Sequence, residues 1–137
     1  MNKYQDSQVI EKILSNSKTI AVVGLSDKPD RPSYGVSNYL IRNGYKIIPV
    51  NPAIKGVFGI NSYPDLLSIP DSIDLVDIFR RSEDVGPIVE QAIAAGAAAV
   101  WMQEGVINPE AADKAGEAGL DIVMDLCIKK EHAKRNA

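Results

Sequence analysis

The sequence has little of the chemistry that disulfides and metal sites require. It contains one cysteine, Cys127, and one histidine, His132, in 137 residues. A single cysteine cannot form an intramolecular disulfide, and this pair falls short of the ligands of an ordinary zinc site. We therefore expect Cys127 to be a buried structural residue and His132 to be a solvent-facing residue of a helix.

Long apolar runs are also missing, which excludes a membrane span, and the polar start of the chain lacks the apolar centre of a signal peptide. These features predict a cytoplasmic protein. A formal net charge of −3 argues against general nucleic-acid binding. The length and a hydrophobic content of 45% fit a single globular domain over residues 1–137.

Apolar, branched segments of strand length alternate with segments of helical spacing. The predicted strands are 19–23, 45–50, 73–79, 97–102 and 120–124. Most are almost continuously apolar, as strands covered on both faces should be. The third carries Asp74 and Asp77 and is expected nearer an edge of the sheet.

The segments between these strands predict helices. One apolar stripe begins at Val9, a second ends at Gly44, and a third runs from Ser82 to Gly96. Asn108 and Pro109 are typical of a helix start at 109–118, and residues 126–134 predict a last helix. The fold class is therefore α/β: a Rossmann-like, doubly wound, five-stranded, mainly parallel sheet with helices on both faces.

The glycine-rich phosphate motifs are absent. Gly24 and Ser26 follow the first strand without the further glycines of a dinucleotide fingerprint, and no P-loop occurs. Gly24 is placed where the chain must turn and approach a ligand, although glycine is common at strand ends. The loops that follow the first three strands carry five cations, which indicates an anion such as phosphate at this edge: Lys28, Arg31, Lys55, Arg80 and Arg81.

The end of the second strand lacks the acidic residue that holds the ribose in NAD sites. Its place is taken by Val50, Asn51 and Pro52, with Lys55 a few residues further on. This pattern favours a nucleotide that carries a phosphate on its ribose.

Five segments together resemble the small CoA-binding domain proteins, which are similar to the CoA-binding domain in the alpha subunit of succinyl-CoA synthetase. These segments are Gly24-Leu25-Ser26, Pro49-Val50-Asn51-Pro52, Asp77-Ile78-Phe79-Arg80-Arg81, Val100-Trp101-Met102-Gln103-Glu104-Gly105 and Asp125-Leu126-Cys127. The resemblance implies a Rossmann-like domain that takes coenzyme A or an acyl-CoA.

The resemblance also implies a role for individual residues. Gly24 and Ser26 would contact the pyrophosphate. The adenosine would be flanked by Val50, Asn51 and Pro52, with Lys55 near the 3′-phosphate. Phe79 and Arg80 would line the path to the pantetheine, Gln103 and Gly105 would face the far end, and Arg31 and Arg81 would reach a phosphate.

Three functions stay open at this point. The first is a stand-alone CoA-binding, carrier or regulatory module without its own catalytic constellation. The second is a component of an acyl-CoA ligase or transferase that needs a partner protein, with Cys127, Glu104 and His132 as its titratable candidates. The third is an NADP-binding oxidoreductase fragment, in which Lys55 would meet the 2′-phosphate. The sequence identifies neither a protein partner nor a homo-oligomer.

Overall fold

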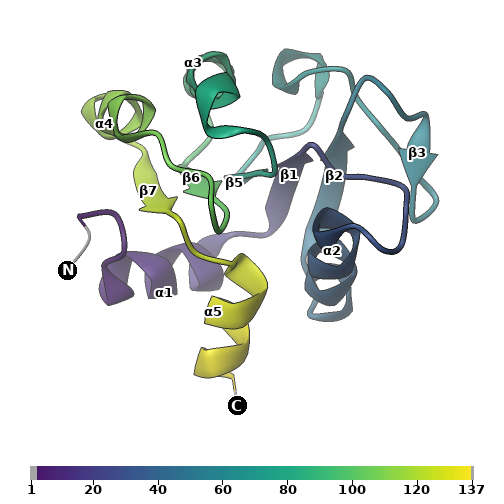
Figure 1. The fold of residues 1–137 in the computed structure, drawn as a ribbon, viewed down its shortest axis with the longest axis horizontal. Helices are drawn as coiled ribbons and strands as arrows, with labels where there is room; N and C mark the ends of the chain where they lie inside the picture. The colour runs from purple at the N-terminus through teal and green to yellow at the C-terminus, as the bar shows by residue number, and fades with distance from the viewer. Residues whose placement is uncertain (1–2, 137) are drawn as a thin grey trace.

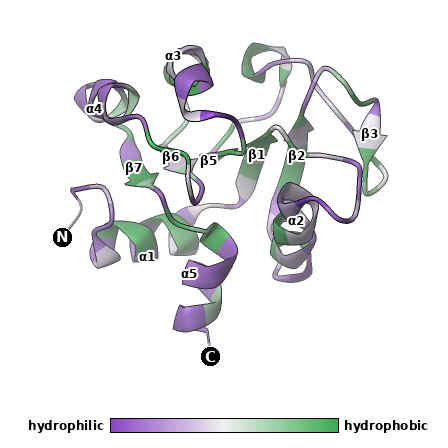
Figure 2. Ribbon diagram, in the orientation of Figure 1, coloured by the Kyte–Doolittle hydropathy of each residue, from purple (hydrophilic) through white to green (hydrophobic). Residues whose placement is uncertain are grey.

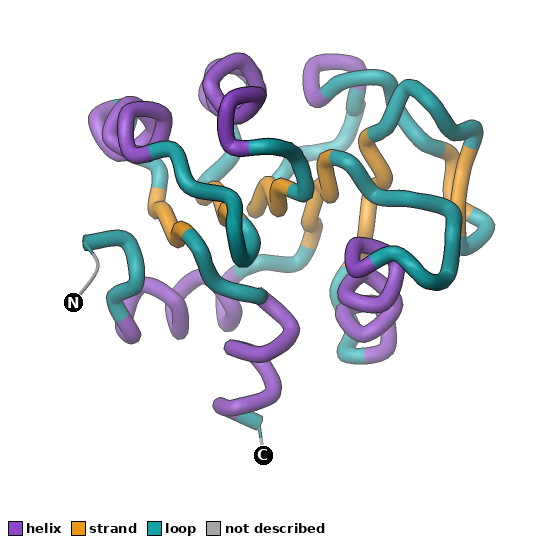
Figure 3. Tube along the Cα trace, in the orientation of Figure 1, coloured by secondary structure: helices purple, strands orange, loops and turns teal. Residues whose placement is uncertain are grey.

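The computed structural model describes residues 3–136 and has a five-stranded, fully parallel sheet (Figures 1 and 3). In spatial order the strands are β2 (Lys46–Val50), β1 (Thr19–Val23), β5 (Leu75–Ile78), β6 (Ala99–Met102) and β7 (Asp121–Met124). The predicted Rossmann-like α/β class is confirmed. All five strands end at one edge, because all five are parallel.

The helices cover both faces of the sheet (Figure 1). On one face lie α1 (Ser7–Asn16), α2 (Pro32–Arg42) and α5 (Ile128–Arg135). On the other lie α3 (Val85–Ala94) and α4 (Pro109–Glu117). None of the helices in residues 3–136 is long and apolar enough to cross a membrane.

Alternation along the strands divides the apolar core into two layers. Ile20, Leu75 and Trp101 pack beneath α1, α2 and α5, whereas Ala21 and Val76 pack beneath α3 and α4. Most strand residues are accordingly hydrophobic, whereas most residues of α5 are hydrophilic (Figure 2). Trp101 is a fully buried core residue whose Nε1 donates to the Leu126 carbonyl at 2.8 Å.

Helix starts follow the sequence signals. The Asn108 side chain accepts a hydrogen bond from the Ala111 amide at 3.0 Å, and Pro109 occupies the first turn, as predicted. The third helix has a 3₁₀ turn, η2 (Ser82–Asp84), before α3 begins at Val85. The later start agrees with the position of Pro87, which an α-helix tolerates only in its first turn.

The expected edge position of the third predicted strand is wrong. The strand β5 is central, and Asp77 is completely buried between Val22 of β1 and Trp101 of β6. Asp74 precedes the strand, where its carboxylate accepts two backbone hydrogen bonds, from Lys18 and Thr19, at 2.9 Å each. Asp74 therefore caps the start of the strand and Asp77 is a buried carboxyl group, so neither aspartate marks an exposed face of the sheet.

The expected solvent-facing position of His132 is also wrong. Its side chain is buried, and its Nδ1 lies 2.7 Å from the Tyr39 hydroxyl. The Tyr39 and Tyr45 rings meet the imidazole edge-on. Burial lowers the pKa of His132, so a neutral ring fills the space between α5 and α2.

A short hairpin between β2 and β5 had no counterpart in the sequence prediction. It consists of β3 (Gly56–Val57) and β4 (Ile60–Asn61), and it is followed by the 3₁₀ helix η1 (Leu66–Ser68). Two-residue strands are too short to give a periodic pattern. The Phe58 ring at the turn lies 4.5 Å from the Tyr34 ring, which holds the hairpin against α2.

Candidate functional site

The strand order reverses between β1 and β5, and the two strand ends meet there. From β1 the chain passes to β2 on one side and returns to β5 on the other. The Phe79 amide donates to the Val23 carbonyl at 2.9 Å, and the Gly24 amide donates to the Val50 carbonyl at 2.8 Å. Open parallel sheets bind ligands at such a reversal, beyond the carboxyl ends of the strands.

Gly24 is required by the fold itself. Its φ is +87°, and a Cβ atom there would overlap the carbonyl oxygen of Phe79. This close approach brings the loops that follow β1 and β5 together. The glycine therefore shapes the floor of the candidate site from the backbone.

Two cavities open on this floor and share Pro32 and Phe79. The first, which we call the loop cavity, measures about 500 Å³. Its lining includes residues from the loops after β1 and β2, among them Gly24, Ser26, Lys28, Arg31, Asn51 and Phe79. The second, which we call the α5 cleft, measures about 820 Å³ and reaches the start of α5 at Cys127. Together they form a path along the edge from β2 to β7.

Cations of the loop cavity have no acidic partners. Lys28 and Arg31 line it, and within residues 3–136 neither makes an ion pair; the same holds for Arg80 and Lys55. Arg81 differs, because its guanidinium lies 3.2 Å from the Asp84 carboxylate. Four cations therefore have their charge available for an anionic ligand.

Two polar residues of the loop cavity hold its walls together. The Asn51 side-chain Nδ2 donates to the Leu25 carbonyl at 3.0 Å, and its Oδ1 accepts from the Ala53 backbone amide at 2.9 Å. The Ser26 hydroxyl accepts from the Lys28 amide at 3.1 Å. Asn51 thus ties the loop after β2 to the loop after β1, and the Ser26 hydroxyl keeps its proton to donate.

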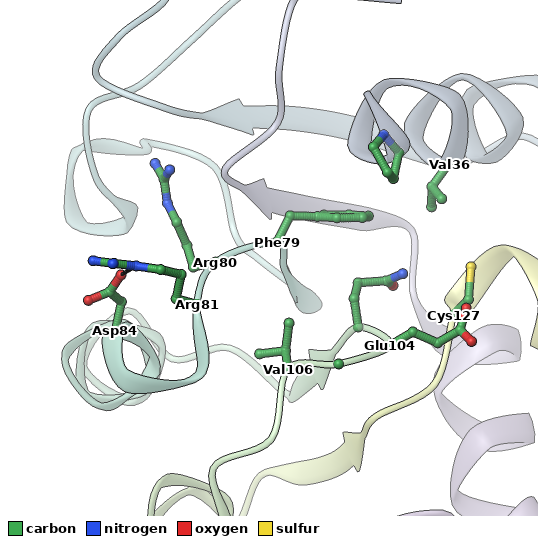
Figure 4. A pocket seen from close by; sticks show the side chains of 11 residues that line it. Val36, Phe79, Arg80, Arg81, Asp84, Glu104, Val106 and Cys127 are labelled. Carbon is green, nitrogen blue, oxygen red and sulfur yellow. Dashed lines mark hydrogen bonds and ion pairs between the residues drawn. The ribbon is translucent and has the colours of Figure 1, made fainter. Parts of the chain in front are cut away.

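The α5 cleft combines apolar walls with charges at its margins. Figure 4 shows the Phe79 ring in the middle, with Arg80, Arg81 and Asp84 to one side and Val36 and Cys127 to the other. Cys127 is buried, as expected, with its sulfur at the wall of the cleft.

The loop after β6 is fixed by hydrogen bonds to its neighbours. The Gln103 side chain accepts from the Ile128 amide at 3.2 Å and so caps the first turn of α5. The Gly105 amide donates to the Asp125 carboxylate at 2.7 Å. Hydrogen bonds within the protein therefore hold the loop after β6 against the start of α5 and the end of β7.

Most of the predicted site residues lie on connected cavities. A third pocket, of about 200 Å³, is lined by Val50, Pro52 and Arg80, and it shares Arg80 with the α5 cleft. Lys55 is exposed and is not among the residues that line these three cavities. The sequence reasoning did not predict Pro32, Val36, Asp84 or Val106 as lining residues, and it named Cys127 only as a titratable candidate of the ligase or transferase alternative. The loop after the last strand carried the signal for Cys127, since that strand ends at the same edge.

A buried carboxyl group lies in the sheet close to this site. Asp77 lies on β5, two residues before Phe79. Among the described residues, neither of the Asp77 side-chain oxygens has a hydrogen-bond partner. Burial raises the pKa of Asp77 well above its usual range and so favours the neutral form of the carboxyl group.

Comparison with known proteins identifies the class that this fold and site define. Residues 18–133 match the model of the CoA binding domain, and the chain belongs to this family. The resemblance inferred from the five sequence segments is thereby confirmed.

Individual relatives fall into two groups by length. The chain is 46% identical to the uncharacterized protein YneT of Bacillus subtilis over 90% of this chain and 92% of that protein. A hypothetical protein from Pyrococcus horikoshii superimposes with a TM-score of 0.92 at 43% identity, over 96% of this chain and 93% of that one. The ADP-forming acetate–CoA ligase II of Archaeoglobus fulgidus is 28% identical over 86% of this chain, which spans only 17% of that enzyme.

Proposed function

We propose that this chain binds coenzyme A, or an acyl-CoA, along the carboxyl edge of its sheet as a stand-alone binding module. The observation that carries the proposal is the continuous path formed by the loop cavity and the α5 cleft, in a chain whose family is the CoA binding domain. Coenzyme A is a long ligand with phosphates at one end and an uncharged pantetheine arm that ends in a thiol at the other.

The charges along the path support one direction of binding. Lys28, Arg31 and Ser26 at the loop cavity offer donors for the pyrophosphate, and Arg80, which makes no ion pair within residues 3–136, lines both the α5 cleft and the small third pocket. Val50 and Pro52 line the small pocket beside Arg80, which suits the adenosine, and the exposed Lys55 lies nearby in sequence for the 3′-phosphate. The pantetheine arm would then pass Phe79 towards Gln103 and Gly105.

The site offers little for catalysis. Among the described residues that line the α5 cleft, the titratable groups other than arginine are Asp84, Glu104 and Cys127. Asp84 is paired with Arg81, and Glu104 is paired with Lys130 at 2.9 Å. A binding, carrier or regulatory role agrees with these pairs better than the ligase or transferase role.

Calorimetric titration of the ligand-free protein with CoA, dephospho-CoA and NADP tests the proposal. We expect saturable binding of CoA and weaker binding of dephospho-CoA, which lacks the ribose phosphate. Binding of NADP with no binding of CoA would replace the proposal by the oxidoreductase alternative. Failure of all three ligands to bind would contradict the proposed function.

A further inference from the structure

We infer that the α5 cleft holds the acyl group of a CoA thioester, and that this acyl group is uncharged. The inference rests on the proposed function and specifies the ligand of the same site. It follows from which walls of the cleft are apolar and from the ion pair that Glu104 makes at the end of the cleft near Cys127, away from Arg80.

Residues from four separate parts of the chain supply the apolar walls. Val36 lies on α2 and Phe79 directly follows β5. Val106 lies in the loop after β6, and Cys127 directly precedes α5. Val36, Val106 and Cys127 are themselves buried, so the cleft is bounded by side chains anchored in the core. An alkyl chain that enters it leaves water for an apolar surface, which favours binding.

The direction of the ligand places its thioester at this apolar end. The unpaired cations Lys28 and Arg31 lie at the loop cavity, whereas Val36 and Cys127 lie on the far side of Phe79 from Arg81 and Asp84 (Figure 4). If the phosphates are held by the cations, the sulfur of CoA comes to rest near Cys127.

The charges at this end leave no partner for a charged acyl group. The Glu104 carboxylate lines the cleft and is bound to the Lys130 ammonium at 2.9 Å. Glu104 and Cys127 both line this cleft, and the Glu104 carboxylate raises the pKa of Lys130. An acyl carboxylate near Cys127 would meet apolar walls and would have to compete with Glu104 for the Lys130 ammonium, and an acyl cation would have to displace Lys130 from Glu104.

A matched pair of four-carbon ligands tests the inference on the unmodified protein. Calorimetry with CoA, butyryl-CoA and succinyl-CoA separates the added alkyl chain from the added carboxylate. We expect butyryl-CoA to bind roughly tenfold more tightly than succinyl-CoA, and more tightly than free CoA. Equal affinity for the three ligands would place the acyl group outside the cleft and overturn the inference, while CoA binding itself would stand.

Tighter binding of succinyl-CoA than of butyryl-CoA would likewise overturn the inference. If none of the three ligands binds, the proposed function fails first and this inference fails with it.

A substitution at Glu104 tests whether this residue causes the preference for butyryl-CoA over succinyl-CoA. Glu104→Gln removes the like charge and releases Lys130, so we expect the succinyl-to-butyryl affinity ratio to rise about threefold to tenfold. Glu104 is exposed, so the substitution leaves the core intact. Glu90→Gln is the matched control, because Glu90 is an exposed, lysine-paired glutamate that lies on α3 and does not line the cleft. An unchanged ratio in Glu104→Gln, or an equal change in Glu90→Gln, would overturn the inference.

Discussion

The loops after β1 and β2 and the loops after β6 and β7 lie at the same edge of one sheet but use their charges in opposite ways. In the first pair, Lys28, Arg31 and Lys55 have no ion-pair partner among the described residues. In the second pair, Glu104 is bound to Lys130, and Asp125 accepts the Gly105 amide.

This difference divides the edge into a half whose cations make no ion pair among the described residues and a half whose charged groups are paired within the protein. Unpaired cations held on short loops favour an anion, because the arrangement exists before the anion arrives. The end of β5 belongs to the first half, because Arg80, which follows it, makes no ion pair within residues 3–136. Substitutions on each side should therefore affect binding and stability differently.

The largest expected effect concerns the backbone contact at the reversal of strand order. Gly24→Val would force a branched side chain onto a residue at φ +87° and against the Phe79 carbonyl. We expect a loss of about 3 kcal/mol or more in the free energy of unfolding, measured by urea denaturation.

The control for Gly24→Val is Gly35→Ala on α2. Gly35 is exposed and has open space where its Cβ would lie, so alanine should stabilise the helix by roughly 0.5–1 kcal/mol. A Gly24→Val protein as stable as the parent would show that β1 and β5 do not constrain each other as described.

The second prediction compares two adjacent arginines. Arg80 has no ion-pair partner among the described residues, whereas Arg81 is already bound to Asp84 and is more exposed. We expect Arg80→Gln to weaken CoA binding about 10- to 100-fold, because a charge-assisted bond to phosphate would be lost.

Arg81→Gln should change the affinity for CoA by roughly threefold or less, because the Arg81 guanidinium already forms an ion pair with Asp84. Calorimetry on the two variants decides the matter. Equal losses would erase the distinction between free and paired cations at this edge.

The third prediction concerns the pH dependence that Asp77 imposes on stability. Burial raises its pKa in the folded protein, so the folded state binds this proton more tightly than the unfolded state does. Stability should therefore fall as pH rises above the ordinary aspartate pKa towards the raised one, by up to about 1.4 kcal/mol per pH unit.

Asp77→Asn should remove this contribution to the slope, which urea unfolding between about pH 5 and pH 8 measures. Asp74→Asn provides the comparison within the same segment, because Asp74 accepts two backbone hydrogen bonds. It should destabilise the protein by roughly 1–2 kcal/mol without removing the slope. Identical slopes in the parent and Asp77→Asn would refute the assignment.

The sequence predicts the architecture well because each element has its own local signal. Continuous apolar segments gave the five strands, and Asn108 with Pro109 gave the start of α4. The position of a strand within the sheet has no such local signal. Asp77 suggested an edge, although the carboxyl group is buried in the central strand.

The site divides in the same way. Residues in the loops at strand ends, such as Ser26 and Arg31, could be predicted, because parallel strands bring those loops to one edge. Val36 and Val106 could not, because a valine that lines a cleft has the same local pattern as a valine in the core. Pairing between distant charges, such as Glu104 with Lys130, likewise depends on the tertiary structure.

The smallest expected effect comes from Lys55, and it tests how far the unpaired half of the edge extends. Lys55 is exposed, unpaired and outside the lining of the cavities, so water screens most of its charge. We expect Lys55→Gln to weaken CoA binding by about threefold and to leave dephospho-CoA binding unchanged, because only CoA carries the ribose phosphate. An equal loss for both ligands would assign Lys55 to the general positive field of the loops rather than to that phosphate. No loss for either would end the binding site at the loop cavity.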